Sequence, residues 1–456
     1  MDLQAELSKI FQGDLDTTDE LREFYSHDAS LFELKPQVVG FPKSTQDVQN
    51  VVRFVTANKQ AYPELSIVPR GRGTDMSGGA IGQSVVLDFS KYMKQLHEVT
   101  PESARVQPGM LFREFDVETL KQGSILPSYP ASRDMASVGG MASNNSGGEK
   151  SLEYGKTDNF VSELSVVLSD GNEYVIRPIN REELTAKMNQ GDFEGNLYAR
   201  TFELLDAHYD EIQAAKPKVS KDSTGYHLWN VWNRETGIFD LTKLFVGAQG
   251  TLGIITDIKF KLVPARKHSG LLVLFLKNSN DLGELIPKVL EHKPATFESF
   301  DDKTLWLSIR FMPSFLKMLG PVRFIHLLIT LIPDGLQLLH GIPKLILLVE
   351  FNGETAEEVR EKVKALHKDL KGQRARYEIN GFEEAASEGK SEKFWILRRN
   401  SFQILRSKVK DKHTAPYIDS YFKDVKQLYD PQNIFNPHKK TDADWDFSYE
   451  HIRQSF

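Results

Sequence analysis

In the first 265 residues, short apolar runs typical of strands alternate with apolar positions at helical spacing. The segment KPQVVGFPKSTQDVQNVVRFVTANKQ places a short β-branched run before four valines at helical spacing between residues 48 and 55. Ser44 or Thr45 is suited to the N-cap of that helix. The runs SIVPRG and SVVLDF follow and have the composition of strands. This order of strand, helix and strand predicts an α/β region.

Three further patterns extend this region. Residues 1–35 are polar and are predicted to be mainly helical, and residues 181–215 are predicted to form helices. Between them, ELSVVLSDGNEYVIRP predicts two strands joined at Asp170-Gly171, a dipeptide that favours hairpin turns. Near the end of the chain, SYFKDVKQLY predicts a helix that stops before Pro431.

After about Pro264 the pattern changes. GLLVLFL, KLILLVEFNG and RARYEIN predict strands, and SNDLGELIPKVLEH and TAEEVREKVKALHKDLKG predict amphipathic helices. We therefore expect a second domain of α+β order. The predicted boundaries are 1–265 for the first domain, 266–428 for the second and 429–456 for a return of the chain to the first.

One apolar stretch, residues 311–349, has two interpretations. It is interrupted by charged residues and four prolines, and it falls short of the ~20 apolar residues that span a bilayer. It predicts either short buried helices with a strand, or an apolar patch that docks on a membrane surface. No segment at the N-terminus has the pattern of a signal peptide.

The amino-acid composition excludes several classes of partner and of catalytic group. The 456 residues include 40% hydrophobic and 26% charged residues, and the net charge is −6, so nucleic acid is not an expected partner. The chain has no cysteine, which excludes disulfides, thiol catalysis and cysteine-ligated iron–sulfur clusters. A cytoplasmic protein is expected, with the inner face of the membrane as the alternative that the apolar stretch leaves open.

The first chemical motif is PRGRGTDMSGG, which starts at Pro69. Glycine permits positive φ and lets an anion approach the backbone closely, so several N–H groups can point at a diphosphate. The spacing GxGxxxxGG is neither the dinucleotide fingerprint nor a P-loop. Taken alone, the motif is equally explained as a glycine turn between strands.

Two more glycine segments follow. SVGGMASNNSGG begins at Ser137, within a long loop rich in Gly, Ser, Asn and Pro, and VGAQGTLGII begins at Val246. A loop of that length inside a compact domain is usually functional. The alternatives are a flexible surface loop for the second segment and a bulged hairpin for the third. Three such segments in this order are far more specific than any one of them.

With these motifs the chain resembles the FAD-binding PCMH-type flavoproteins, the vanillyl-alcohol oxidase superfamily. Within it, the chain is most similar to the branch of D-lactate dehydrogenase and the glycolate oxidase flavin subunit. The resemblance covers about Pro36 to Pro264 and resumes at YDPQNIFNP, which begins at Tyr429. It implies an α+β fold with a two-subdomain PCMH-type FAD-binding domain and a substrate cap domain built on an antiparallel sheet.

The resemblance also implies the residues that bind FAD. The first segment would hold the diphosphate through backbone amides, the second would line the diphosphate and the flavin ring, the third would lie at the adenine side, and Asn436 would lie near the ring. The implied residues are Arg70, Gly71, Arg72, Gly73, Thr74, Asp75, Met76, Ser77, Pro130, Ser132, Ser137, Val138, Gly139, Gly140, Ala142, Ser143, Asn144, Gly148, Tyr154, Gly155, Thr157, Gly250, Gly253, Ile254, Ile255 and Asn436.

Many members of this family attach the flavin through His or Cys. Here no histidine lies between His27 and His97 and cysteine is absent, so non-covalent FAD is expected. In the second domain, the segment WILRR resembles a family element whose arginine grips a substrate carboxylate, which makes Arg398 a candidate. His413 is a candidate base. A surface arginine and a structural histidine are the alternatives.

The resemblance implies an FAD-dependent enzyme that oxidises a D-2-hydroxy acid such as D-lactate. Hydride would pass to flavin N5, and electrons would leave to a quinone or a partner protein. The chain lacks the roughly one hundred residues by which relatives add metal ligands and a base, so no metal is expected. Two alternatives stay open. One is a flavin-binding subunit or remnant that needs a partner chain. The other is a different reaction on the same scaffold, either oxidation of a sugar or alcohol or the non-redox ether-lipid synthesis of a related branch.

Overall fold

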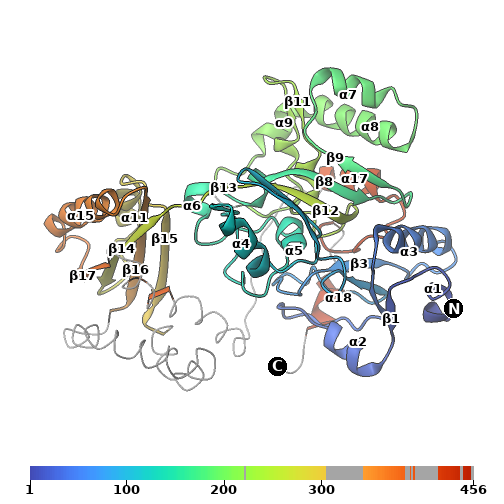
Figure 1. Cartoon of the computed structure of the whole chain (residues 1–456), viewed down its shortest axis with the longest axis horizontal. Coiled ribbons are helices and arrows are strands. Elements are labelled where there is room, and N and C mark those ends of the chain that lie inside the picture. The colour runs from blue at the N-terminus through green and yellow to red at the C-terminus, as the bar shows by residue number, and fades with distance from the viewer. Residues whose placement is uncertain are drawn as a thin grey trace. The chain divides into compact units, whose positions relative to one another are not determined.

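The computed structural model describes residues 1–219, 222–303, 343–385, 391, 394–395, 420–441 and 445–452 (Figure 1). They form two compact units. The first consists of Met1–Gly148, Gly155–Pro264 and Thr414–Ser455, and the second mainly of Ala265–His413 together with Glu149–Tyr154. No helix in the described parts of the chain is long and apolar enough to cross a membrane.

The first sheet of the first unit has the order β1-β2-β4-β3. Strands β2 (Val38–Phe41), β4 (Val85–Asp88) and β3 (Ile67–Arg70) are parallel, and β1 (Asp14–Asp16) is antiparallel to β2. Continuous apolar runs of this kind are typical of parallel strands buried on both faces. Helix α3 (Thr45–Asn58) buries the four predicted valines, and the side chain of Ser44 caps it by accepting from Asp47 N–H.

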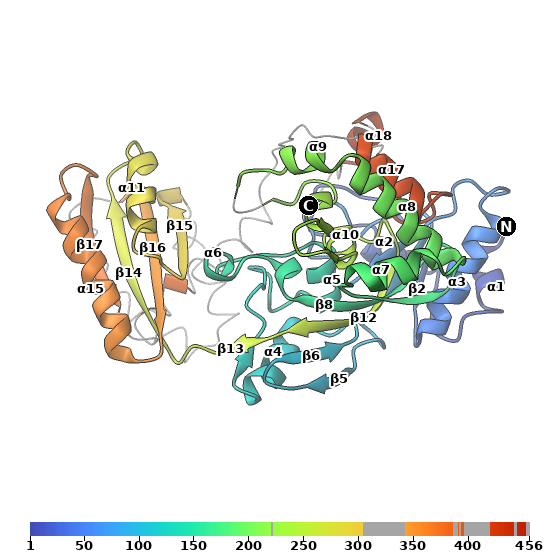
Figure 2. The ribbon, with the colours of Figure 1, turned by 90° about the horizontal axis from the view of Figure 1, so that it is seen from above.

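The second sheet of this unit is antiparallel, with the order β5-β6-β12-β8-β9. Figure 2 shows β8, β12, β6 and β5 side by side. The strands are β5 (Leu96–Val99), β6 (Ser103–Val106), β12 (Ile254–Lys261), β8 (Val161–Val167) and β9 (Glu173–Ile176). The predicted hairpin at Asp170-Gly171 joins β8 to β9, and Gly171 has the positive φ (77°) that such turns favour.

Several helices follow the strands of this sheet along the chain. Helix α4 (Phe112–Lys121) follows β6, and the region 181–215 forms α7 (Arg181–Met188), α8 (Phe193–Ala207) and α9 (Tyr209–Ala214), as predicted. The C-terminal helix α17 (Ser420–Tyr429) ends before Pro431 and packs on α8, where the hydroxyls of Tyr429 and Thr201 lie 3.2 Å apart.

The second unit is a four-stranded antiparallel sheet with the order β15-β16-β14-β17. The strands are β14 (His268–Leu276), β15 (Thr296–Asp301), β16 (Leu345–Gly353) and β17 (Ile379–Ala385). Leucines of β14 pack with α11 (Leu282–Leu290) and α15 (Ala356–Gly372) on one face, and Phe394 and Trp395 cover the other. The predicted α+β class is confirmed.

Two local predictions were wrong. Residues 1–35 are helical only in α1 (Leu3–Leu7) and α2 (Asp19–Tyr25), because β1 pairs with β2 between them. The RARYEIN segment is mostly a turn after α15, and Glu378 has a φ of 48°, so the strand begins only at Ile379. Of the apolar stretch 311–349, residues 311–342 lie outside the described residues; Leu345 to Val349 belong to β16, which is the strand that the sequence predicted.

Candidate cofactor site

The first glycine segment leaves the sheet at the end of β3 as an irregular loop. The backbone N–H groups of residues 71–76 donate to no acceptor in the described structure, whereas those of Ser77 and Gly79 donate to the Asp75 carboxylate at 3.0 and 2.8 Å. Gly73 has a φ of 60°. Consecutive free N–H groups in a glycine-rich loop form a concavity suited to an anion.

Arg70 precedes this loop but its side chain turns into the protein. The guanidinium is buried and donates to the backbone carbonyls of His27 (2.9 Å) and Ala80 (3.0 Å), and it lies 4.9 Å from the centre of the Tyr25 ring. Burial lowers the pKa of Arg70, and nearby Asp28 and Asp88 oppose that effect. Arg70 therefore anchors the start of the loop by its side chain.

The second glycine segment forms the short helix α5 (Val138–Ser143), capped by Ser137, whose hydroxyl accepts from Gly140 N–H. It lies directly against the first loop. A Cβ on Gly71 would come within 2.1 Å of Ser137 Oγ, so only glycine fits at that contact. The side chain of Asn145 is buried, its oxygen accepts from Asp158 N–H, and its Nδ2 has no partner in the described structure.

The third glycine segment connects the other two through Gln249. The N–H groups of Gly247 and Gln249 donate to the carbonyls of Ala142 (3.0 Å) and Ser143 (2.8 Å). The side-chain amide of Gln249 donates to Ser77 Oγ at 2.7 Å. Gln249 has a φ of 53°, which is uncommon for a residue other than glycine and marks a constrained position.

The closing motif joins the same assembly from the far end of the sequence. Asn436 Nδ2 donates to the carbonyls of Gly79 (2.8 Å) and Gln249 (2.7 Å), and the Asn436 N–H donates to Ile67 O at 2.9 Å. The buried Lys426 ammonium donates to Thr251 O and Phe435 O, both at 2.7 Å, and pairs with Asp430. Four segments remote in sequence are thus hydrogen-bonded into one site within the first unit.

A polar cluster borders the second segment. His227 is buried, and its ring nitrogens lie 3.9 Å from Asp158 and 3.7 Å from Asp222, which is too long for hydrogen bonds. Lys156 donates to Asp222 O (2.5 Å) and Ser223 Oγ (2.7 Å). Although burial opposes it, contact with His227 and Lys243 lowers the pKa of Asp158. The cluster places charged groups beside the glycine segments.

The sequence-predicted residues fall into distinct environments. Gly250 and Gly253 pack against Pro69 and Val166, and Ile254 and Ile255 lie in β12, so these four belong to the framework of the third segment. Thr157 is buried and donates to Ser146 O at 2.8 Å. Of the remaining predicted residues, Arg72, Thr74 and Met76 lie in the first loop, and Gly139, Ala142 and Asn144 lie in α5 or at its C-cap. Gly148 packs against Pro130, Gly155 packs against Asn159, and the Ser132 carbonyl accepts from Met135 and Ala136 N–H.

For three candidates the described structure does not test a place at this site. Tyr154 belongs to the second unit, and Arg398 and His413 lie outside the described residues. In turn, the structure adds Gln249 and Lys426, which were not selected from the sequence. The signal for Gln249 was its position between Gly247 and Gly250, where a turn forces unusual backbone angles. Nothing in the local pattern marked Lys426.

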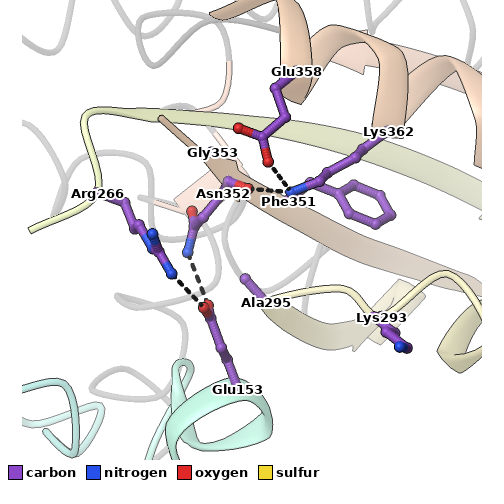
Figure 3. Close-up of a pocket in the computed structure, with 9 residues that line it drawn as sticks. All are labelled: Glu153, Arg266, Lys293, Ala295, Phe351, Asn352, Gly353, Glu358 and Lys362. Carbon is purple, nitrogen blue, oxygen red and sulfur yellow. Dashed lines mark hydrogen bonds and ion pairs between the residues drawn. The ribbon is translucent and has the colours of Figure 1, made fainter. Parts of the chain in front are cut away.

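The second unit contains a polar pocket of about 270 Å³ (Figure 3). Arg266 pairs with Glu354 and approaches Glu153 at 3.9 Å, while Lys362 donates to Glu358 and to Asn352 O. These two cations are therefore already engaged by protein groups. The lining consists of Glu153, Arg266, Lys293, Ala295, Phe351, Asn352, Gly353, Glu358 and Lys362.

Comparison with known families decides the identity of the glycine assembly. Residues 36–177 match the family described as FAD binding domain, and residues 265–420 match the C-terminal domain of FAD linked oxidases. The chain therefore carries an FAD binding domain followed by the C-terminal domain of FAD linked oxidases. FAD is accordingly the cofactor of this chain. The resemblance inferred from the sequence is confirmed.

Two relatives and one structure illustrate the match. The chain is 28% identical over 366 residues to D-2-hydroxyglutarate dehydrogenase of Pantoea ananatis, covering 78% of this chain and 34% of the relative. It is 28% identical over 282 residues to D-lactate dehydrogenase of Anaerostipes hadrus, covering 61% and 47%. It shares the fold of alkyldihydroxyacetonephosphate synthase, with a TM-score of 0.59 and 16% identity over 88% of this chain and 63% of that one. The chain spans about a third to a half of the length of these two relatives.

The residues present fit an FAD molecule. A diphosphate needs several N–H donors, and the run at residues 71–76 offers them without competition from the protein. Two buried amide atoms of the same assembly, Asn145 Nδ2 and Asn436 Oδ1, also lack partners in the described structure. A buried polar atom without a partner is costly, so each is suited to a ligand.

Proposed function

We propose that this chain is an FAD-dependent oxidoreductase that converts a D-2-hydroxy acid to the corresponding 2-oxo acid. The observation that carries the proposal is the assembly of four remote segments around the free N–H groups of residues 71–76. Relatives named D-2-hydroxyglutarate dehydrogenase and D-lactate dehydrogenase indicate the substrate class. FAD supplies the acceptor for the two electrons of the hydroxy acid.

The first unit would hold the cofactor without a covalent bond. The loop from Gly71 to Met76 would bind the diphosphate through its N–H groups, and α5 with Asn145 would line the remainder of the molecule. Asn436 would fix the ring side because it already ties the loop to the third segment. Each of these contacts depends on backbone placement, which explains why glycine is used where segments meet.

The second domain, proposed to span residues 266–428, would supply the substrate contacts. Arg398 would grip the carboxylate, for which a planar guanidinium is well shaped, and His413 would accept the hydroxyl proton. Electrons would then leave to a quinone or an electron-transfer protein, since the chain has no cysteine with which to hold an iron–sulfur cluster.

A second candidate function is that of a flavin-binding subunit that needs a partner chain for catalysis. It is favoured by a relative that is named as a subunit, the glycolate oxidase subunit of Bacillus subtilis, to which the chain is 28% identical over 359 residues. In this case FAD would bind as described, but the hydroxy acid would not be oxidised by the isolated chain.

The test is an anaerobic titration of the purified protein reconstituted with FAD. D-2-hydroxyglutarate or D-lactate should bleach the visible flavin bands, and the L-enantiomers serve as matched controls. Bleaching by a D-acid alone supports the enzyme. Bound flavin that no hydroxy acid reduces would contradict it and favour the partner-dependent subunit, and bleaching by an alcohol or sugar would move the reaction to another class.

A further inference from the structure

Two adjacent lysines, Lys439 and Lys440, follow the closing motif. Both are partly buried, and neither makes an ion pair in the described structure. Lys440 Nζ reaches one acceptor, Ser223 O, at 3.4 Å. Lys439 Nζ would lie 3.7 Å from a Cβ on Gly78, which places it against the first glycine loop. Ammonium groups withdrawn from water without a directly paired anion are costly.

Burial accordingly lowers the pKa of both lysines, that of Lys440 to about 8. The groups facing them define the local charge. Asp28 and Asp75 face Lys439, whereas Asp75, Asp222 and the cation Lys156 face Lys440. Lys156 and Lys440 approach the same residue, Ser223, so two positive charges meet there.

The carboxylate of Asp75 would repel an anion that binds to the first loop. This carboxylate is held by Ser77 and Gly79 N–H groups within the very loop whose residues 71–76 offer free N–H groups. A diphosphate bound to those groups would therefore meet a fixed negative charge, and repulsion between close charges is strong where water is partly excluded. A compensating positive charge is needed at the same place.

We propose that Lys439 and Lys440 are binding residues for the FAD diphosphate, which they attract by neutralising Asp75 and adding positive charge beside the N–H groups of the first loop. The diphosphate in turn gives the two lysines the direct ion pairs that the described residues do not supply. This inference rests on the proposed placement of the diphosphate and not on the reaction that the enzyme catalyses.

The experiment measures FAD affinity of the flavin-free protein by fluorescence quenching, with Lys439→Gln, Lys440→Gln and the control Lys94→Gln. Lys94 is exposed in the same unit, and its side chain makes no hydrogen bond within the described residues, so it controls for net charge. At about 20 mM salt each test variant should raise the Kd about tenfold, which is the loss expected for one charge-assisted contact. At about 0.5 M salt the ratio should fall to roughly twofold because salt screens the attraction.

Two further variants keep the result interpretable. Lys439→Arg and Lys440→Arg retain the charge and should stay within about threefold of the natural protein, and thermal unfolding checks that each variant folds. An unchanged Kd in the Gln variants would overturn the proposal. A loss of affinity that is equal at both salt concentrations, or that the Arg variants share, would also overturn it, because either result indicates a structural role.

The two proposals fail separately. In one outcome, FAD affinity depends on the two lysines as described, but no hydroxy acid reduces the bound flavin. This outcome contradicts the proposed enzyme and still supports the diphosphate site. A chain that oxidises a D-2-hydroxy acid while the Gln variants bind FAD normally contradicts the diphosphate site and leaves the enzyme standing.

Discussion

The two units provide hydrogen-bond partners for their backbone N–H and C=O groups in different ways. The second unit does so with regular elements: β14 pairs with β16 over nine residues without a break, and α11 and α15 cover one face of the sheet. The first unit contains glycine segments that form little regular structure and are held by side chains from remote positions, such as Asn436 and Gln249. Its candidate site lies in those segments.

This difference teaches where a single substitution should matter. In a regular sheet, each ladder hydrogen bond has neighbours that persist when one side chain changes. In the glycine assembly, single side chains link remote segments, as Gln249 does to Ser77 and Asn436 does to Gly79. We therefore expect matched substitutions to be tolerated in the second unit and to disrupt the first.

The largest expected effect compares two lysines that each pair with an acid four residues away. Lys426 and Asp430 are 8% and 0% exposed, whereas Lys362 and Glu358 are 42% and 41% exposed. Lys426→Met should cost about 3–5 kcal/mol, because it leaves a buried carboxylate and two carbonyls without their cation. Lys362→Met should leave the free energy of unfolding almost unchanged. Hydrogen exchange of each unit measures both, and equal losses would break the comparison.

Replacing one glycine in each unit provides the second test of the comparison between the two units. A Cβ on Gly250 would come within 2.3 Å of Pro69 Cγ, and Gly250 has a φ of 69°, so Gly250→Ala should cost about 2–3 kcal/mol. Gly283 in α11 has no atom within 4 Å of its Cβ position, so Gly283→Ala should stabilise the second unit by about 0.5–1 kcal/mol. Urea unfolding distinguishes the two signs, and a neutral Gly250→Ala would show that the third segment can rearrange.

The smallest expected effect is a pH dependence of opposite sign in the two units. The folded pKa of Lys440 lies at about 8, below its ordinary 10.5, so its charge destabilises the flavin-free fold below pH 8 and this cost disappears as the pH rises from 8 to 10.5. Lys440→Met should therefore raise the melting temperature by about 2 °C at pH 7, and the gain should fade above pH 8.

Lys288 in the second unit supplies the contrast. Hydrogen bonds to Glu291 and Asp369 raise its pKa, so its charge stabilises the fold below 10.5 and this contribution is lost as the pH rises through the higher folded value. Lys288→Met should lower the melting temperature at pH 7. If FAD is added in excess, Lys440→Met should also become destabilising, and a persistent gain would contradict its contact with the diphosphate.

Much of the fold followed from local pattern. The valines of α3, the hairpin at Asp170-Gly171 and the strands β14 and β16 were predictable because periodicity and turn chemistry act over a few residues. The RARYEIN segment failed because the end of α15 and the positive φ of Glu378 place a turn where the composition favours a strand.

The sequence by itself determined the classes of element, the three glycine segments and the cofactor family, since each of these is written in short motifs. The tertiary structure decided which groups meet. Asn436 contacts Gly79 across 357 positions, and Lys439 lies against Gly78 across a similar separation. Such pairings depend on how the sheets stack, and no spacing along the chain encodes them. For that reason the free N–H groups of the first loop and the unpaired lysines beside it became visible only in the folded chain.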